Sequence, residues 1–439
     1  MRWTIPVVSA VIALPIVGCQ GIPQQASPYV PASYGLALAG RERVIHSFAG
    51  SPHGELPGGN PIVDPAGGLY GTTERGGTNN SCGSGCGTIF RLWPNSRGRW
   101  NETTLWSFDL YHGAYPGYPL VADAAGNLYG ATDVGGNLGV AYGLLHRKRD
   151  LQFQVLHNFQ GGYDGAQPRS SLIIDRHGNL YGTTVGGGTG GSGGGGTIYE
   201  LIPSGSSWTE KILYRFSPYT NGANPQAELL FGRGGSFYGT TTYGGDNACP
   251  QGCGVVFELT PAAKGRWTES VLHSFNGSDG CYSGAGLVSD AAGNLFGSTD
   301  EGGSGGCSLR ATHDRGQSGC VNGCGTLFQL SHGARGHYSF TVVHYFTAPT
   351  GAGPSGNMVF DAAGSLYGSA VIGGSGSGVV FKLAPAAHNH WEYTVLHAFS
   401  NTPDGSLPTG VVMGANGKLY GMTIGGGALG LGAAFEVTP

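Results

Sequence analysis

The chain has 439 residues, of which 85 are glycine and only 11% are charged, and its formal net charge is −4. A high glycine content can indicate disorder, but 39% hydrophobic and 10% aromatic residues are more than disordered segments carry. The longest basic cluster is the short segment 146–149, so the sequence argues against a nucleic-acid partner. This composition favours many short strands joined by tight turns.

The first 18 residues have the pattern of an export signal. Arg2 supplies a positive charge, and residues 4–17 form an apolar stretch that is too short to span a bilayer. Residues 16–19, Ile-Val-Gly-Cys, resemble the lipobox of bacterial lipoproteins, in which the signal peptide is cut before the cysteine and its thiol carries diacylglycerol. An ordinary signal peptide with a chance cysteine is the alternative. We expect an exported protein that Cys19 anchors to the cell envelope, at the outer membrane or cell surface, with no other membrane contact.

Residues 19–40 are rich in proline and glutamine and predict a flexible tether without a core of its own. From residue 41 to the end, the sequence repeats itself. The clearest anchor of the repeat is an aromatic residue followed by glycine. It recurs at intervals of 52 to 71 residues, at Tyr70, Tyr129, Tyr181, Tyr238, Phe296, Tyr367 and Tyr420. A period of this length predicts a repeat architecture of seven units.

Each unit is expected to contain four short strands. Typical examples are residues 171–175, 295–299, 254–259 and 267–275 for the first to the fourth strand. They are rich in β-branched and aromatic residues and are separated by Gly, Pro, Asn or Asp. Four strands per unit of this size are typical of a blade of a β-propeller. A small residue after each aromatic anchor is expected to let neighbouring blades approach closely.

The two ends of the repeat array indicate how the ring closes. The last unit stops after its third strand, at residues 435–439. Residues 44–48, before the first unit, have the pattern of a fourth strand but no first three strands ahead of them. The seven fourth strands end at Phe48, Phe108, Phe159, Phe216, Phe275, Phe346 and Phe399. We therefore predict an all-β fold, a seven-bladed propeller over residues 41–439, in which residues 44–48 pair antiparallel with residues 432–437. Such closure removes the unpaired edges of an open stack.

The repeated motif Gly-Asn-Leu-Tyr-Gly-Thr-Thr, followed by Gly-Gly and then Gly-Thr-Ile-Phe, resembles the Gloeo/Verruco tandem repeat of exported bacterial proteins, the choice-of-anchor GloVer-repeat proteins. Residues 69–73 with 87–90, and 180–184 with 196–199, match it best, while residues 143–146 of the second copy depart from it. The resemblance implies export, anchoring and a propeller. It implies no particular activity or cofactor.

Eight cysteines remain after Cys19. Six form C-x3-C pairs at one repeat position: Cys82/Cys86, Cys249/Cys253 and Cys320/Cys324. An even number of cysteines in an exported chain favours disulfides. Cys281 and Cys307 are expected to pair as well, because the inter-blade loop and the loop between second and third strands emerge on one face of a propeller. Zinc held by neighbouring cysteine pairs is the alternative.

Three features repeat with the units, and we interpret all three as structural. An aspartate six residues before the anchor is expected to cap a hairpin turn, at Asp64, Asp123, Asp175, Asp290 and Asp361. Histidines on the fourth strand interchange with Trp106 and Tyr214, which favours packing over metal ligation; they are His46, His157, His273, His344 and His397. The inter-blade loops carry Gly-x-x-Pro turns, at Gly54/Pro57, Gly113/Pro116, Gly165/Pro168, Gly222/Pro225, Gly351/Pro354 and Gly405/Pro408.

The candidate site consists of residues that do not repeat. After the second strand, acidic residues occur in three copies only: Glu74, Asp133, Asp300 and Glu301. The fifth copy also has an insertion, residues 302–325, that contains His313, Asp314 and Arg315. All of these loops are expected on the same face as the inter-blade loops, and functional residues concentrate on loops over a rigid scaffold.

No nucleophile elbow, P-loop, dinucleotide fingerprint or zinc-protease motif is present in the sequence. We therefore expect a monomeric, non-enzymatic module, without metal or cofactor, that binds a glycan, a peptide or a partner protein through the loop face. The alternative is an extracellular polysaccharide hydrolase or lyase that uses the loop-face carboxylates. This alternative hypothesis requires two carboxylates about 5–10 Å apart.

Overall fold

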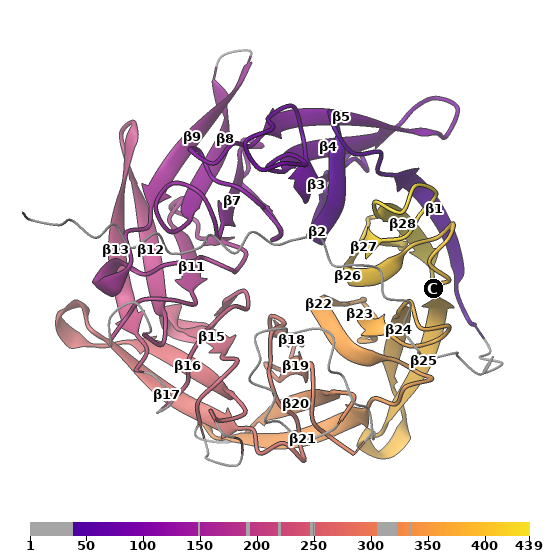
Figure 1. The fold of residues 1–439 in the computed structure, drawn as a ribbon. Coiled ribbons are helices and arrows are strands. Elements are labelled where there is room, and N and C mark those ends of the chain that lie inside the picture. The colour runs from indigo at the N-terminus through magenta and orange to yellow at the C-terminus, as the bar shows by residue number, and fades with distance from the viewer. Residues whose placement is uncertain are drawn as a thin grey trace, which may run out of the picture. The chain divides into compact units, whose positions relative to one another are not determined.

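A computed structural model describes residues 38–147, 150–189, 194–217, 221–245, 249, 251–304, 323–333 and 336–439. These residues form seven four-stranded antiparallel sheets arranged as blades around a ring (Figure 1). The predicted seven-bladed β-propeller is confirmed. Within the described residues, no helix is long and apolar enough to cross a membrane.

The blades follow the sequence copies in order. Blade 1 contains β2 (Gly54–Val63), β3 (Leu69–Gly76), β4 (Thr88–Pro94) and β5 (Trp100–Ser107). Blade 2 contains β6 (Val121–Ala122), β7 (Leu128–Thr132), β8 (Val140–Arg147) and β9 (Asp150–Asn158). Blade 3 contains β10 (Ile173–Ile174), β11 (Leu180–Thr184), β12 (Thr197–Ser204) and β13 (Ser207–Arg215). Blade 4 contains β14 (Leu230–Phe231), β15 (Phe237–Thr240), β16 (Val255–Pro261) and β17 (Trp267–Ser274).

The remaining blades have the same strand order. Blade 5 contains β18 (Val288–Ser289), β19 (Leu295–Thr299), β20 (Thr326–His332) and β21 (Tyr338–Tyr345). Blade 6 contains β22 (Ala352–Phe360), β23 (Leu366–Ile372), β24 (Val379–Pro385) and β25 (Trp391–Ala398). Blade 7 contains β26 (Ser406–Met413), β27 (Leu419–Gly425), β28 (Ala433–Thr438) and β1 (Arg41–Ser47). Short 3-10 turns lie at Gly162–Asp164, Arg233–Gly235, Ala263–Gly265 and Ala387–Asn389.

The first strand of the described chain closes the ring. β1 pairs antiparallel with β28, from Arg41 opposite Thr438 to Ser47 opposite Ala433, and Figure 1 shows the two strands side by side. The predicted closure is confirmed, and the closing strand begins at Arg41, three residues before the predicted start.

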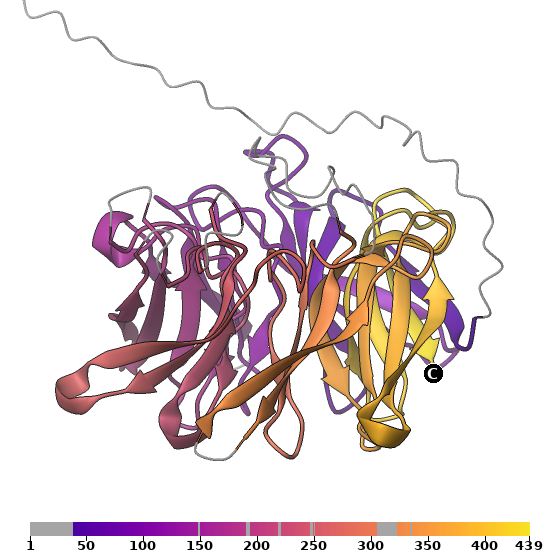
Figure 2. The ribbon, with the colours of Figure 1, turned by 90° about the horizontal axis from the view of Figure 1, so that it is seen from below.

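One face of the ring carries most of the irregular backbone (Figure 2). There, residues of the inter-blade loops form single β-bridges with residues that follow the second strand of the same blade. These bridges join Ala114 to Val134, Ala166 to Gly186, Ala223 to Tyr243 and Cys281 to Glu301. The two sets of loops therefore share one face, as predicted, and we call this the loop face.

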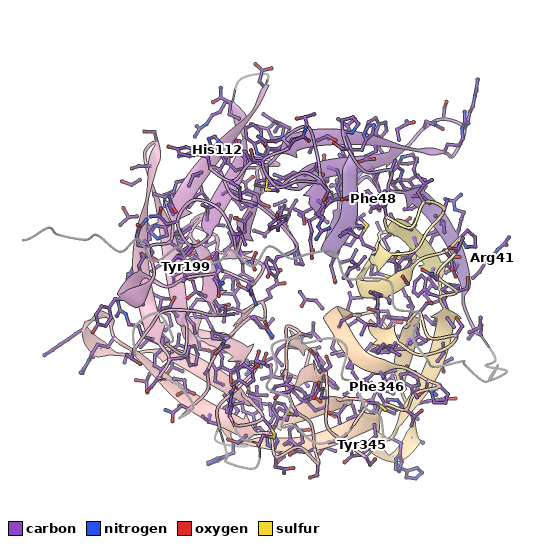
Figure 3. All side chains as sticks on the ribbon, viewed as in Figure 1. Arg41, Phe48, His112, Tyr199, Tyr345 and Phe346 are labelled. Atoms are coloured by element: carbon purple, nitrogen blue, oxygen red, sulfur yellow. A yellow bond between two sulfur atoms is a disulfide. The ribbon has the colours of Figure 1, made fainter. Side chains whose placement is uncertain are left out.

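Aromatic residues hold neighbouring blades together. The phenylalanine that ends each fourth strand packs edge-to-face on an aromatic residue in the third strand of the next blade, with ring centroids 5.0 to 5.5 Å apart. The pairs are Phe48–Phe90, Phe108–Tyr142, Phe159–Tyr199, Phe216–Phe257, Phe275–Phe328, Phe346–Phe381 and Phe399–Phe435. Figure 3 labels Phe48, Tyr199 and Phe346, which belong to three of these pairs.

The glycine after each aromatic anchor serves this packing from inside the blade. A Cβ on Gly182 would lie 2.5 Å from the hydroxyl of Tyr199, the third-strand aromatic residue opposite it in the same sheet. The glycine thus makes room for the ring that receives the phenylalanine of the preceding blade. The prediction that this glycine lets neighbouring blades approach closely is therefore wrong. The glycine instead makes room for a side chain on the adjacent strand of its own blade.

The repeated aspartates cap turns, as predicted. Asp290 Oδ1 accepts hydrogen bonds from the backbone N–H groups of Ala292 and Asn294, both at 2.9 Å. The same two bonds occur at Asp64, Asp123, Asp175 and Asp361.

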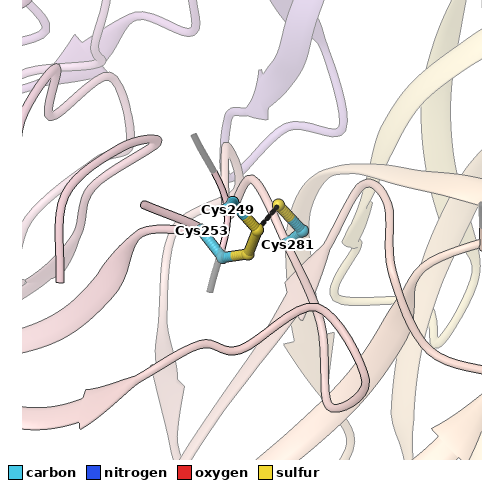
Figure 4. A group of neighbouring side chains, drawn as sticks. All are labelled: Cys249, Cys253 and Cys281. Carbon is cyan, nitrogen blue, oxygen red and sulfur yellow. Dashed lines mark hydrogen bonds between the residues drawn. A yellow bond between two sulfur atoms is a disulfide. The ribbon is translucent and has the colours of Figure 1, made fainter. Parts of the chain in front are cut away.

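The cysteines cluster on the loop face. The predicted Cys82–Cys86 and Cys249–Cys253 disulfides are confirmed. Cys324 is also disulfide-bonded, whereas Cys307 and Cys320 lie outside the described residues, so the pairing of Cys281 with Cys307 stays a prediction. The Sγ atom of Cys281 lies 3.6 Å from that of Cys249 (Figure 4), which brings the loop before blade 5 against the second-to-third loop of blade 4.

Candidate functional site

A cavity of about 360 Å³ lies among the inner strands and is lined by residues from all seven blades. We call it the axial channel. Its volume is at the lower end of the range for pockets that bind small molecules, roughly 300–1,000 Å³. Because every blade contributes, the wall is set by seven rigid sheets rather than by one mobile loop.

Two positions in or just before the first strand of each blade supply most of the wall. They are the first and third residues after the proline of the Gly-x-x-Pro turn, which face the same way because side chains alternate along an extended chain. Blade 3 places Arg169 and Ser171 there, and blade 4 places Gln226 and Glu228. The corresponding residues of blades 5 and 6 are Gly284, Gly286, Ser355 and Asn357.

A third position lies four residues after the aromatic anchor, near the loop face. Asp300, Val371 and Ile424 line the channel from this position. Glu74 and Asp133 occupy the same repeat position in blades 1 and 2. Three of the four candidate acids identified from the sequence, all except Glu301, therefore belong to one ring of positions around the channel.

The predicted residues reach the channel to different extents. Asp300 lines it directly. Glu74 does not line it and lies next to the lining residue Gly117, since a Cβ added to Gly117 would be 2.9 Å from Glu74 Oε1. Asp133 accepts a hydrogen bond of 3.0 Å from Nε of Arg169, and the two side chains are 16% and 24% exposed. Glu301 is not among the lining residues; its backbone is bridged to Cys281 on the loop face. His313, Asp314 and Arg315, like Cys19, lie outside the described residues.

Hydrogen bonds across the channel link distant blades. Asn357 of blade 6 donates from Nδ2 to Glu228 Oε2 of blade 4, and its Oδ1 accepts from the N–H of Gly286 in blade 5 at 3.1 Å. A Cβ on Gly286 would lie 2.6 Å from Asn357 Oδ1, so a larger residue here would displace the Asn357 side chain. Asn60 of blade 1 donates to the carbonyls of Asn357 and Val411, both at 3.1 Å. These hydrogen bonds hold the side chains of Asn60, Glu228 and Asn357 in place in the absence of a ligand.

The electrostatics of the channel favour neutral or cationic ligands. Glu228 and Asp300 line the channel, Glu74 lies next to it beside Gly117, and Asp133 neutralises the one guanidinium, that of Arg169. Burial raises the pKa of the Glu228 carboxyl, against the opposing effect of hydrogen bonds from Asn357 and Ser171. Burial also raises the pKa of Glu74, and the neighbouring Asp133 raises it further. An anionic ligand would add to this excess of negative charge.

One polar atom of the wall has no partner. Oδ1 of Asn60 is buried and makes no hydrogen bond within the described part of the chain, while Nδ2 of the same amide donates twice. A buried acceptor without a donor costs about 1–3 kcal/mol.

Sequence reasoning missed most polar residues of this wall, among them Asn60, Arg169, Gln226, Glu228 and Asn357. Their signal was present, because they vary between copies at positions fixed by the repeated Gly-x-x-Pro turn. The sequence interpretation treated these turns as connections and did not follow the strand inward from them.

The chain matches the model of the Gloeobacter/Verrucomicrobia repeat over residues 32–189, 139–309 and 309–439. No curated protein matches it. Similar solved structures include a periplasmic gluconolactonase from Pseudomonas aeruginosa, with 12% identity and a TM-score of 0.49 over 84% of this chain and 99% of that one. A candidate 6-phosphogluconolactonase from Bacteroides uniformis has 15% identity and a TM-score of 0.48 over 76% and 84%. A gluconolactonase from Xanthomonas campestris has 14% and 0.41 over 81% and 90%.

Proposed function

This chain belongs to the Gloeobacter/Verrucomicrobia repeat family, and we propose that its axial channel binds a small polyhydroxylated ligand, a saccharide unit, without changing it chemically. The observation that carries the proposal is the convergence of amide, carboxyl, hydroxyl and guanidinium groups from different blades on one cavity of about 360 Å³. Fold alone does not supply a function, because propellers serve many.

The mixture of donors and acceptors supports a saccharide. A sugar hydroxyl donates and accepts at once, so it can bond to carboxyl and amide oxygens and equally to a guanidinium. Asp300 offers acceptors, and Arg169 offers donors. Val371 and Ile424 provide an apolar side for the C–H groups of a sugar ring. The excess of carboxyl groups argues against a sulfated or phosphorylated sugar.

A second function, cleavage of a polysaccharide, is favoured by one observation. Burial raises the pKa values of Glu74 and Glu228, and an acid whose pKa is raised can hold the proton that a general acid donates. Release of reducing ends or of unsaturated sugars from a bound polysaccharide would distinguish this function from binding alone.

The protein is proposed to act at the cell envelope, held by a lipid on Cys19. The support is the lipobox-like sequence of residues 16–19. The variant Cys19→Ser should lose labelling by a fatty-acid analogue and be released from membranes. Membrane association that persists without label would contradict the anchor.

The binding proposal is tested with the purified full-length protein in detergent on a glycan array, followed by titration of the best saccharide. Asp300→Asn and Arg169→Met should each weaken binding by about tenfold or more, because a lost hydrogen bond to a charged group is worth about 1.5–3 kcal/mol. Glu301→Gln is the matched control, since this neighbouring acid does not line the channel. An array without any bound glycan contradicts the saccharide assignment, and equal effects of Asp300→Asn and Glu301→Gln contradict the site.

A further inference from the structure

Three positions meet at every boundary between neighbouring blades, on the outer strands and away from the axial channel. The first lies two residues before the phenylalanine that ends a fourth strand. The second is the loop residue before the glycine of the Gly-x-x-Pro position. The third lies on the fourth strand of the next blade, six residues before its own terminal phenylalanine. We call each set a boundary triplet.

Three boundary triplets are joined by ring stacking. His273 of blade 4 stacks on Phe340 of blade 5, with centroids 3.6 Å apart and an interplanar angle of 4°. Trp106 on Phe153 and His344 on Tyr393 are stacked in the same way, at 4.4 and 3.9 Å. At these boundaries the packing role that the sequence predicted for the fourth-strand residues is confirmed.

Two boundary triplets instead bring together one imidazole and two carboxyl groups. Between blades 2 and 3, His157 Nε2 lies 3.0 Å from Asp164 Oδ1 and 3.6 Å from Glu210 Oε1. Between blades 6 and 7, His397 Nε2 lies 3.0 Å from Asp404 Oδ2, and Glu42 of β1 completes the set. In each triplet, one ligand atom from every residue lies within 4.8 Å of the others. The sequence interpretation missed these sets, because it considered the histidines without the acids that meet them from the loop and the next blade.

The glutamates in these triplets are incompletely satisfied. Oε1 of Glu42 and Oε1 of Glu210 are buried and have no hydrogen-bond partner among the described residues. Glu102 and Glu269, at the same position in two other blades, also each have a buried Oε1 without a partner there. Ionising a buried carboxyl group with no donor is costly, and burial accordingly raises the pKa of Glu42 to about 7 and that of Glu210 to about 9. A cation can take the place of the proton that such a carboxyl group holds.

We propose that His157/Asp164/Glu210 and His397/Asp404/Glu42 are two binding sites for a divalent cation of the size of Zn²⁺, each joining two neighbouring blades. Bonds of about 2.0–2.2 Å in a tetrahedral site place ligand atoms about 3.3 Å apart. The measured separations of 3.0 and 3.6 Å around His157 bracket that edge. Two carboxylates and a neutral imidazole match the charge of the ion, and a water completes the tetrahedron.

The two sites have different consequences for the ring. The blade 2/3 site links blades that are continuous in sequence. The blade 6/7 site uses Glu42, which lies on β1, the strand that closes the ring. A cation there fastens the N-terminal strand to the preceding blade by a link other than backbone pairing. It should therefore stabilise the closed ring more than the blade 2/3 ion does.

The test is zinc titration of untagged full-length protein with its disulfides intact, followed by calorimetry and by metal analysis after dialysis. The wild type should bind two Zn²⁺ per chain, one for each triplet. Glu210→Gln and Glu42→Gln should each leave one ion, and the double variant none. Zinc should raise the melting temperature of the wild type but not of the double variant, because an ion that binds only the folded state stabilises it.

Two matched variants use the boundary between blades 4 and 5, where His273 and Asp279 form the same 2.9 Å contact but Phe340 replaces the glutamate. His273→Gln should leave both zinc ions in place, and Phe340→Glu should create a third site. If a glutamine variant fails to fold, His157→Gln and His397→Gln remove the imidazole ligand instead. Wild-type protein that binds no zinc, or a stoichiometry of two that persists in the double variants, would overturn the proposal.

Discussion

His344 is a histidine that the fold buries without offering its Nε2 a hydrogen-bond partner among the described residues. Its ring stacks on Tyr393 at the boundary between blades 5 and 6. Burial lowers the pKa of His344 from 6.5 to about 4, so the folded protein keeps this imidazole neutral. The cationic form of this imidazole would have no acceptor for its Nε2–H group among the described residues.

This predicts a specific pH dependence of stability. Between pH 6.5 and about 4, the unfolded chain binds a proton at His344 that the folded chain does not, so this histidine lowers the free energy of unfolding as the pH falls through that window. Above pH 6.5 its contribution is constant. His344→Phe removes the titration and keeps the stacking. Urea unfolding should show the variant gaining about 2–3 kcal/mol on the wild type between pH 7 and 4.

The comparison between the two proteins is essential, because other groups titrate in the same range. A difference in the free energy of unfolding between wild type and His344→Phe that stays constant from pH 7 to 4 would contradict the account. His273, stacked on Phe340 but hydrogen-bonded to Asp279 at 2.9 Å, offers a contrast. Its aspartate supplies the acceptor that His344 lacks.

Some residue roles could be predicted from the sequence and others could not. An aspartate shortly before Gly-Asn predicts a turn capped by its own side chain, and Asp290 caps its turn in this way. The role of a fourth-strand histidine depends on the next blade, about 50 residues further along the chain. His273 and His157 occupy the same repeat position, yet one meets Phe340 and the other meets Glu210. Repeat position alone therefore predicted packing but not the partner.

At the level of elements, β1 is the strand that closes the ring, because it completes the sheet of blade 7. It is seven residues long, it pairs with β28 along its length, and Ile45 of this strand is buried, as is Phe48 just after it. Without it, β28 would present an unpaired edge, and the third-strand Phe90 of blade 1 would lose the ring that packs on it.

Deleting residues 41–48 should therefore destabilise the whole ring and expose a sheet edge that promotes aggregation. Thermal unfolding and light scattering measure the two effects. Deleting residues 20–38 is the matched control and should leave the melting temperature unchanged. Equal stability of both deletions would contradict a closing role for β1. Closing so long a loop costs little, because loop entropy grows only with the logarithm of length.

The number and order of strands could be predicted because each copy carries its own turn residues and strand pattern, and because the strand count left one fourth strand spare. The start of β1 at Arg41 could not, because residues 41–43 (Arg-Glu-Arg) lack a strand-like apolar pattern. They extend the strand through pairing with Glu436, Val437 and Thr438.

At the scale of the whole molecule, sevenfold repetition makes the scaffold nearly symmetric, while the channel wall is not symmetric. Blades 3 and 4 supply Arg169 and Glu228, whereas blade 5 supplies Gly284 and Gly286 at the same two positions. The glycines leave space that is filled by Asn357 of blade 6 and by Asp300 of blade 5 itself. An asymmetric lining on a symmetric frame is what a site for one asymmetric small molecule requires.

Three acids at or near this wall could be predicted from the sequence, whereas Glu228 and the amide side chains of the wall could not. Glu74, Asp133 and Asp300 stand out in the sequence because other copies have Val185, Val371 and Ile424 there. The bond from Asn357 to Glu228 joins residues 129 positions apart and skips a blade. Only the curvature of the closed ring brings them together, and no local pattern encodes it.

The central claim, that the axial channel is the binding site, is tested most directly by hydrogen exchange with and without a saturating saccharide from the array. The account predicts slower backbone exchange at residues 169–171, 226–228, 284–286 and 355–357, in four blades at once, with the fourth strands unchanged. Protection confined to the outer strands or to the rim of the loop face, with these inner segments unaffected, would contradict it.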